Sequence, residues 1–244
     1  MNGRPKRWKD INEVTLSVLV PAFNEGPTVE AVVERLSEVP LRIEILAVND
    51  GSADDTGTHL DRLLREGRLH RVIHHPTNRG KGAAIRSAVA AATGDVMVVQ
   101  DADLEYDPAE LADLIQPILD GRADAVYGSR FLGGPHRVLY FWHRVGNWAL
   151  TLLSNMLTDL NLTDMETCYK MVRSDLMKRL PLTTDRFGFE PELTARLSQA
   201  RARIYEMPIT YAGRTYAEGK KINWKDGVAA IWHILRFNFV RPRM

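Results

Sequence analysis

Two aspartates separated by one residue, Asp101 and Asp103, are the clearest candidates for chemistry in this sequence. Side chains at i and i+2 of an extended chain point the same way, so both carboxylates can face one cation, with Glu105 as a candidate third ligand. Such oxygen ligands favour Mg²⁺ or Mn²⁺, which complete their shells with water and phosphate oxygens. An Asp-x-Asp pattern is also a common turn and helix cap before a proline such as Pro108. We favour the metal site because the pair follows an apolar run, Val96–Val99.

Two further polar segments suggest a nucleotide ligand. The turn at residues 49–52 either caps the next helix or uses Asp50 to accept a hydrogen bond from a nucleobase or ribose. The loop at residues 78–82 carries Arg79 and Lys81 between glycines at the start of a helix, an arrangement that suits a diphosphate. The chain lacks a Walker A loop, and no Gly-x-Gly-x-x-Gly follows its first apolar run. Nucleotide-sugar chemistry is therefore the natural class.

The elements that must position these residues alternate regularly. Short apolar runs rich in β-branched residues predict parallel strands at Leu16–Val20, Ile43–Val48, Arg71–His74, Val96–Val99 and Ala123–Tyr127. Amphipathic segments between them predict helices at Thr28–Glu38, Asp54–Glu66, Gly82–Thr93 and Pro108–Asp120, and a longer helix is expected at His143–Leu157. We therefore expect an α/β fold with a doubly wound, mostly parallel sheet and helices on both faces. In such sheets, ligands bind beyond the carboxyl ends of the strands.

Composition excludes several classes of protein. The 244 residues include 32 Lys and Arg against 31 Asp and Glu, and this balance argues against a protein that binds nucleic acid over a broad basic face. A single cysteine excludes an intramolecular disulfide framework and fits a reducing compartment. No apolar run is long enough for a signal peptide or a spanning helix, so we expect a cytoplasmic protein.

Taken together, these segments closely resemble family 2 glycosyltransferases. The resemblance rests on SVLVPAFNE (residues 17–25), VNDGS (48–52), NRGKG (78–82) and DADLE (101–105), in this order. Later segments, including Gly128-Ser129-Arg130 and Phe189-Glu190, resemble the branch of dolichol-phosphate mannose synthases and polyprenyl-phosphate glycosyltransferases. The resemblance implies a GT-A fold, a nucleotide-diphosphate sugar donor of the GDP-mannose or UDP-glucose type, a divalent metal, and inverting transfer of a hexose to a polyprenyl or dolichyl phosphate.

The resemblance also assigns roles to residues. It implies a nucleoside pocket at Pro21, Asn24, Glu25 and Asp50, and a metal cluster at Asp101, Asp103 and Glu105. Arg130 and Arg144 match arginines that hold the acceptor phosphate, whereas Arg214 and Lys221 match a basic pair that contacts the donor phosphates. We expect Asp103, Arg130 and Arg144 to be the catalytic residues, and Arg79, Lys81 and Asp101 to complete the donor site.

A single domain is expected, with residues 15–130 binding the nucleotide sugar, 131–222 facing the acceptor and 223–244 forming an amphipathic helix. Apolar residues of that helix fall on one face, at Val228, Ile231, Trp232, Leu235 and Phe239. This face either packs on the sheet or on a second subunit, or lies in the cytoplasmic surface of a membrane as a peripheral anchor. Two alternatives to the lipid acceptor remain open: a soluble glycosyltransferase acting on a small-molecule or polysaccharide hydroxyl, and a non-catalytic nucleotide-sugar-binding protein.

Overall fold

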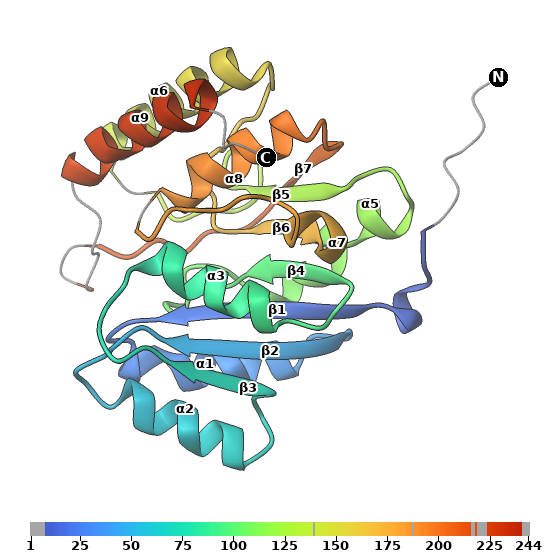
Figure 1. The fold of residues 1–244 in the computed structure, drawn as a ribbon, viewed down its shortest axis with the longest axis vertical. Coiled ribbons are helices and arrows are strands. Elements are labelled where there is room, and N and C mark those ends of the chain that lie inside the picture. Colours follow the sequence, from blue (N-terminus) through green and yellow to red (C-terminus); the bar gives the residue numbers. More distant parts are fainter. Residues whose placement is uncertain (1–7, 139, 187, 216–217, 219–223, 241–244) are drawn as a thin grey trace.

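The computed structural model describes residues 8–138, 140–186, 188–215, 218 and 224–240. Within them, the strands form one seven-stranded sheet in the order β3-β2-β1-β4-β6-β5-β7 (Figure 1). These strands are β1 (Thr15–Ala22), β2 (Arg42–Asn49), β3 (Arg71–His74), β4 (Val96–Val99), β5 (Ala125–Ser129), β6 (Lys170–Arg173) and β7 (Ile204–Pro208). All neighbours pair in parallel except β6, which is antiparallel to both β4 and β5. The expected α/β fold with a mostly parallel sheet is confirmed.

Helices cover both faces of this sheet. They are α1 (Gly26–Ser37), α2 (Thr56–Arg65), α3 (Lys81–Ala91), α4 (Leu111–Leu114), α5 (Gln116–Leu119), α6 (Phe141–Thr158), α7 (Ser174–Met177), α8 (Phe189–Gln199) and α9 (Trp224–Phe239), with short 3-10 helices η1 (Ile11–Glu13) and η2 (Pro108–Glu110). The connections through α1 and α2 lead from β1 to β2 and then to β3, at one edge of the sheet. The connection through α3 leads back past β1 to β4. Because such crossovers are right-handed, α3 lies on the opposite face from α1 (Figure 1).

Apolar periodicity explains most of these elements. The core of β1 is fully buried on both faces, as expected for a central parallel strand. In α1 the buried residues include Val29, Val32 and Val33, which recur at helical spacing. One prediction fails: the segment Pro108–Asp120 is not a single helix but η2, α4 and α5 in succession. Pro117 is the second residue of α5 and has no backbone N–H to continue the ladder of hydrogen bonds from α4.

Two features of the sheet define the edge where ligands would bind. Strand β1 lies between β2 and β4, so the connections from these strands leave in opposite directions and open a crevice at their carboxyl ends. Strand β6 runs the other way, and its first residue, Lys170, pairs with Tyr127 of β5. The segment before β6 therefore reaches the same edge as the ends of β4 and β5.

Helices α6, α8 and α9 pack together beyond β5 and β7 (Figure 1). The face of α9 that is buried carries Ala230, Ile234 and Phe237, and the Arg196 guanidinium of α8 lies 5.3 Å from the Phe237 ring. The apolar residues expected to share one face are not the ones that pack: Val228, Ile231, Trp232 and Phe239 are exposed. No helix in the described part of the chain is long and apolar enough to cross a membrane.

Candidate active site

The acidic segment after β4 faces three basic or hydroxyl partners. Lys81 Nζ lies 2.8 Å from an Asp101 carboxylate oxygen, and Arg214 Nη2 lies 2.9 Å from Asp103. Glu105 accepts hydrogen bonds from the Tyr211 hydroxyl at 2.7 Å and from the Arg214 backbone N–H at 2.9 Å. The segment that follows β7 is thus fastened to the acidic segment that follows β4.

The structure does not bring Asp101, Asp103 and Glu105 together as ligands of one ion. Among the described residues, no three His, Cys, Asp or Glu side chains have the arrangement of a metal site. The expectation assumed an extended chain, but residues 102 and 103 form a turn, and Leu104 has a φ of 62° in the left-handed region. This turn directs Glu105 toward Tyr211, so the structure does not support a third metal ligand there.

The remaining pair, Asp101 and Asp103, does suit a hard divalent cation. Burial, together with the charges of Asp101 and Glu105, raises the pKa of Asp103 to about 7. A bound divalent cation would relieve this repulsion between neighbouring carboxylates. Two protein ligands are enough for Mg²⁺ or Mn²⁺, because these ions keep several waters or take phosphate oxygens.

Lys81 lies at the centre of a small buried ion cluster. Its Nζ contacts Asp101 and, at 3.0 Å, the Glu190 carboxylate at the start of α8. Burial opposes the charge of Lys81, but Asp101 and Glu190 outweigh it and keep its pKa well above the usual value. Lys81 therefore supplies a fixed positive charge beside Asp101. Arg79, from the same loop, is exposed.

Asp50 positions the loop at residues 78–82. Its buried carboxylate accepts the backbone N–H groups of Arg79 at 3.0 Å and Gly80 at 2.7 Å, and His75 Nδ1 lies 2.6 Å away. Gly80 has a φ of 98°, and a side chain there would collide with the backbone of Asp185. Both oxygens of Asp50 are thus used within the protein, which indicates that Asp50 shapes this loop. Contact of Asp50 with a base or ribose stays a prediction.

The loop after β1 is tied to the loop after β2. Asn24 has a φ of 52°, its backbone N–H donates to Ser52 Oγ at 3.0 Å, and its side-chain oxygen accepts from Ala53 N at 2.9 Å. Glu25 precedes α1, and its carboxylate lies 3.6 Å from Arg214 Nη1. Pro21 is half-buried in β1. These predicted nucleoside-pocket residues therefore form one wall beside Asp103 and Arg214.

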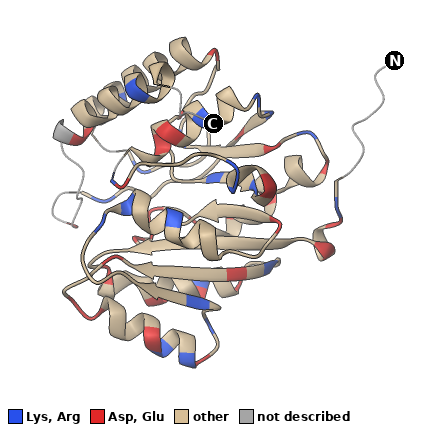
Figure 2. Ribbon diagram, in the orientation of Figure 1, with Lys and Arg blue, Asp and Glu red and all other residues tan. Residues whose placement is uncertain are grey.

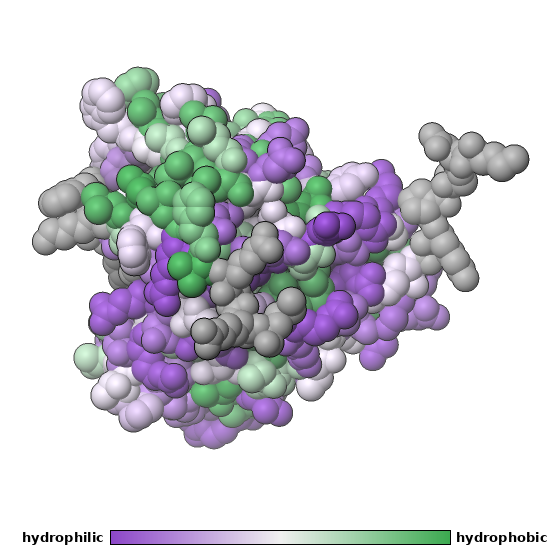
Figure 3. Space-filling model, turned by 45° about the horizontal axis from the view of Figure 1, so that its top comes forward, coloured by the Kyte–Doolittle hydropathy of each residue, from purple (hydrophilic) through white to green (hydrophobic). Residues whose placement is uncertain are grey.

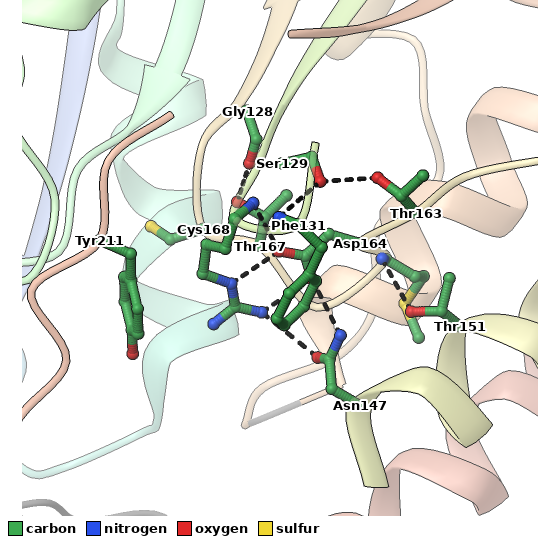
Figure 4. Close-up of polar contacts among 12 residues, drawn as sticks. Gly128, Ser129, Phe131, Asn147, Thr151, Thr163, Asp164, Thr167, Cys168 and Tyr211 are labelled. Carbon is green, nitrogen blue, oxygen red and sulfur yellow. Dashed lines mark hydrogen bonds and ion pairs between the residues drawn. The ribbon is translucent and has the colours of Figure 1, made fainter. Parts of the chain in front are cut away.

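Arg130, just after β5, is held by a fully buried aspartate (Figure 4). Asp164 accepts from Arg130 Nε at 2.6 Å and from Nη2 at 2.8 Å, and Nη2 is shared with Asn147 of α6 at 3.3 Å. The third guanidinium nitrogen, Nη1, makes no hydrogen bond to the described residues. Asp164 thus fixes the orientation of Arg130 while leaving one donor nitrogen for a ligand.

The Phe131 ring separates the two predicted acceptor arginines. The Arg130 guanidinium lies 5.6 Å from this ring and the Arg144 guanidinium 5.5 Å from it. Arg144 is exposed on α6 and has no ion-pair partner in the described part of the chain. Arg130 also lies 5.1 Å from the Tyr211 ring, so Tyr211 connects the acidic segment to the arginines. Lys221, predicted to contact donor phosphates, lies outside the described residues.

A second buried ionic cluster was not predicted from the sequence. Lys170 Nζ donates to the carbonyls of Met165 and Thr167 beneath the site, and burial lowers its pKa to about 8. Nearby, Glu166 has a shielded carboxylate oxygen without a hydrogen-bond partner among the described residues, and burial with the charge of Glu190 raises its pKa to about 7. The only sequence signal for this cluster was a lysine flanked by apolar residues.

Comparison with known proteins now identifies the family. The model of glycosyl transferase family 2 matches residues 17–180. The chain belongs to this family. The glycosyltransferase is 30% identical over 220 residues to an undecaprenyl-phosphate mannosyltransferase of Micrococcus luteus, covering 87% of this chain and 90% of the relative. It is 29% identical over 212 residues to a polyprenol monophosphomannose synthase of Mycolicibacterium smegmatis, covering 83% and 79% of the two chains.

Solved structures confirm the GT-A fold of this glycosyltransferase. A glucosyl-3-phosphoglycerate synthase from Mycobacterium tuberculosis, crystallised with Mn²⁺, uridine diphosphate and glucosyl-3-phosphoglycerate, superposes with a TM-score of 0.72. The match covers 94% of this chain and 82% of the synthase, at 23% identity. An identity this low establishes the shared fold but not the substrates.

Proposed function

We propose that this glycosyltransferase transfers a hexose, with inversion, from a nucleotide-diphosphate sugar of the GDP-mannose or UDP-glucose type to a polyprenyl or dolichyl phosphate. The observation that carries the proposal is the position of Arg144. Its unpaired guanidinium lies 5.5 Å from the Phe131 ring, which Arg130 also contacts, and exposed apolar side chains precede and follow it on α6. An acceptor that is anionic at one end and apolar beyond it suits this surface. The named activities of the two bacterial relatives support the same acceptor class.

We assign the donor to residues 15–130 and the acceptor to residues 131–222. In support, Asp50, Lys81, Asp101 and Asp103 all lie in the first part, after the carboxyl ends of β2 and β4 and at the start of α3. Arg144 lies in the second part. Arg130 stands at the junction, where it can serve both.

A lipid phosphate explains why the site needs no general base. A phosphate monoester has a second pKa near 6, so at neutral pH it is mostly a dianion and nucleophilic without proton removal. A sugar hydroxyl would require a base, and Asp103 and Asp164 are the candidates by residue type. Asp164 is fully buried and bound to Arg130, and Asp103 is assigned to the cation, which counts against a hydroxyl acceptor.

The residues then share two tasks. Arg144 and Nη1 of Arg130 hold the acceptor phosphate in line with the sugar. One phosphate oxygen bonds to the anomeric carbon while the bond from that carbon to the donor diphosphate breaks, and the electron pair leaves with the nucleoside diphosphate. Arg79, Lys81 and Arg214 stabilise the charge that develops there. A divalent cation held by Asp101 and Asp103 would add positive charge for the same leaving group.

The proposal is tested with a panel of nucleotide sugars in Mn²⁺ or Mg²⁺. Each donor is offered with a short polyprenyl phosphate, with 3-phosphoglycerate, with free glucose and with no acceptor. We expect one donor to be consumed with formation of a prenyl-phosphate sugar. Transfer to glucose or 3-phosphoglycerate, with none to the prenyl phosphate, would refute the proposed acceptor.

Variants of Tyr211 separate its ring contact with Arg130 from its hydrogen bond to Glu105. Tyr211→Leu removes the ring beside Arg130 and should raise the Michaelis constant for the acceptor roughly 2- to 30-fold, since a cation–π contact contributes about 0.5–2 kcal/mol. Tyr211→Phe keeps the ring and loses only the hydrogen bond to Glu105, so its acceptor constant should stay within about twofold of the parent. Equal acceptor constants for the Phe and Leu variants would contradict this role of the ring.

An exposed apolar surface supports peripheral membrane binding. Figure 3 shows hydrophobic residues gathered over the part of the molecule formed by α6 and α9. The exposed apolar and aromatic side chains of these two helices include Phe141, Trp142, Trp148, Met156, Val228, Trp232 and Phe239. Figure 2 shows that charged residues are interspersed elsewhere over the fold, whereas Arg144 is the single Lys, Arg, Asp or Glu of α6. Aromatic and aliphatic side chains at such a surface favour the boundary between lipid headgroups and acyl chains.

We expect the protein to co-float with vesicles that contain anionic lipid at low salt. Ile231→Ser with Trp232→Ser should weaken flotation at least about tenfold, because both side chains are exposed and lose apolar area for the lipid. Deletion of α9 is a poorer test, because it would uncover the surface that Ile234 and Phe237 bury. The control is Leu64→Ser on α2, because Leu64 is also exposed and apolar but α2 lies at the opposite end of the molecule (Figure 1). Flotation that is unchanged in the double variant would place the membrane contact elsewhere.

A further inference from the structure

A cavity lies between α6 and the segment that follows it. Its volume is about 270 Å³, and its apolar walls come from Phe131, Trp148, Leu152 and Leu162. Trp148 and Leu152 are 64% and 43% exposed, so the cavity lies at the molecular surface and not in the core. This volume is at the small end for a ligand pocket and suits a short fragment of a long chain.

The uncharged polar side chains that line the cavity already form hydrogen bonds within the protein. Asn155 exchanges two hydrogen bonds with the backbone of Leu162, at 2.8 and 3.1 Å. Thr151 Oγ1 accepts from the backbone N–H of Met165 at 3.1 Å, and Thr163 Oγ1 lies 2.6 Å from Ser129 Oγ (Figure 4). Arg144 is the one charged residue of this lining, and its guanidinium has no hydrogen-bond or ion-pair partner among the described residues. The cavity therefore offers apolar walls and one cation.

The cation and the apolar groups lie along one line of α6. Arg144, Trp148, Leu152 and Met156 are spaced four residues apart, which places them in sequence along one side of the helix. These four residues form a stripe about 18 Å long, at a rise of 1.5 Å per residue. Beyond Leu152 the stripe ends at Met156, which is 73% exposed. A molecule with an anionic head at Arg144 would direct its hydrocarbon along this stripe and over the cavity.

We propose that Trp148, Leu152 and the cavity bind the first isoprene units of the acceptor, those next to the phosphate that pairs with Arg144. The inference rests on the proposed function and adds a specific site to it. The rest of the chain lies over Met156 and the apolar surface of α6 and α9. The protein thus recognises the hydrocarbon next to the phosphate as well as the phosphate itself.

The test compares soluble acceptors of increasing length: methyl phosphate, dimethylallyl phosphate, geranyl phosphate and farnesyl phosphate, each below its micelle concentration. For the parent, we expect the Michaelis constant to fall at least about tenfold from methyl to geranyl phosphate, with little further change at farnesyl phosphate. Leu152→Trp, which fills the cavity from an exposed position, should remove this dependence on chain length. Leu64→Trp, at an exposed leucine of α2 outside both the cavity and this row of α6 residues, is the matched control and should retain it.

Donor binding and the melting temperature of each variant, measured alongside, establish that it is folded. Equal constants for all four phosphates in the parent, or a chain-length dependence that survives Leu152→Trp, would overturn the site while leaving lipid-phosphate transfer intact. Transfer to 3-phosphoglycerate with none to any prenyl phosphate would instead overturn the proposed function and the site together.

Discussion

Asp103→Asn should reduce transfer about a thousandfold or more in saturating Mn²⁺, with the fold retained. The substitution removes one of the two carboxylates suited to a divalent cation, and loss of the cation would withdraw several kcal/mol of transition-state stabilisation. The protein should remain folded because neutralising Asp103 relieves repulsion from Asp101 and Glu105, and Arg214 keeps its ion pairs with Glu25 and Glu105. The measurement is the transfer rate over a Mn²⁺ titration, together with thermal unfolding.

Asp107→Asn is the matched control for Asp103→Asn. Asp107 lies four residues further along, is exposed, and only caps η2 through the Ala109 backbone N–H at 3.1 Å. Its variant should transfer at nearly the parental rate. An Asp103→Asn rate within tenfold of the parent would remove Asp103 from the metal site.

The second large effect is on stability. Arg130→Ala should lower the melting temperature by about 6–20 °C, because it leaves the fully buried Asp164 charge unpaired. Breaking a buried ion pair from one side costs about 3–5 kcal/mol, and in a chain of this size each kcal/mol shifts the melting temperature by roughly 2–4 °C. Differential scanning calorimetry at neutral pH measures the shift.

Two further variants separate the structural role of Arg130 from its contact with the acceptor. Adding Asp164→Asn to Arg130→Ala removes the orphaned charge and should recover much of the lost stability. Arg144→Ala, at an exposed position, should melt within about 2 °C of the parent while the Michaelis constant for the acceptor rises at least about tenfold, since a charge-assisted bond contributes roughly 1.5–3 kcal/mol. An Arg130→Ala protein that melts like the parent would show that Asp164 does not depend on Arg130.

The sequence predicted those parts of the fold that depend on local patterns. Buried strands such as Val96–Val99 are continuous β-branched runs, and α1 repeats its apolar residues at helical spacing. Strand β6 was not predicted, because four residues that begin with a buried lysine carry little strand signal. The direction of β6 and its place between β4 and β5 depend on pairings with distant residues.

The sequence predicted which polar segments meet at this edge of the sheet, but not the contacts that they make. The acidic segment and the basic loop meet at one edge because parallel strands end there. Hydrophobic periodicity could not show that the Asp50 carboxylate accepts a hydrogen bond from a loop 29 residues further along the chain. Nor could it show that the turn at Leu104 directs the Glu105 side chain away from the aspartate pair. It also could not choose the buried face of α9, because a helix with apolar residues on most sides can pack through more than one of them.

The antiparallel pairing of β5 with β6 also bears on how such enzymes can diversify. Tyr127 and Lys170 are partners in the sheet, so residues 130–169 leave and re-enter the fold at neighbouring positions. This segment carries Arg130, Arg144 and the α6 cavity, whereas Asp50, Asp101 and Asp103 lie outside it. The entropy of closing a loop changes slowly with its length, so a longer or shorter segment can be accommodated between the same two anchors. If the proposed function holds, a family built on this sheet can therefore exchange its acceptor-binding segment as one insertion, through recombination or by design, while the residues assigned to the donor keep their positions.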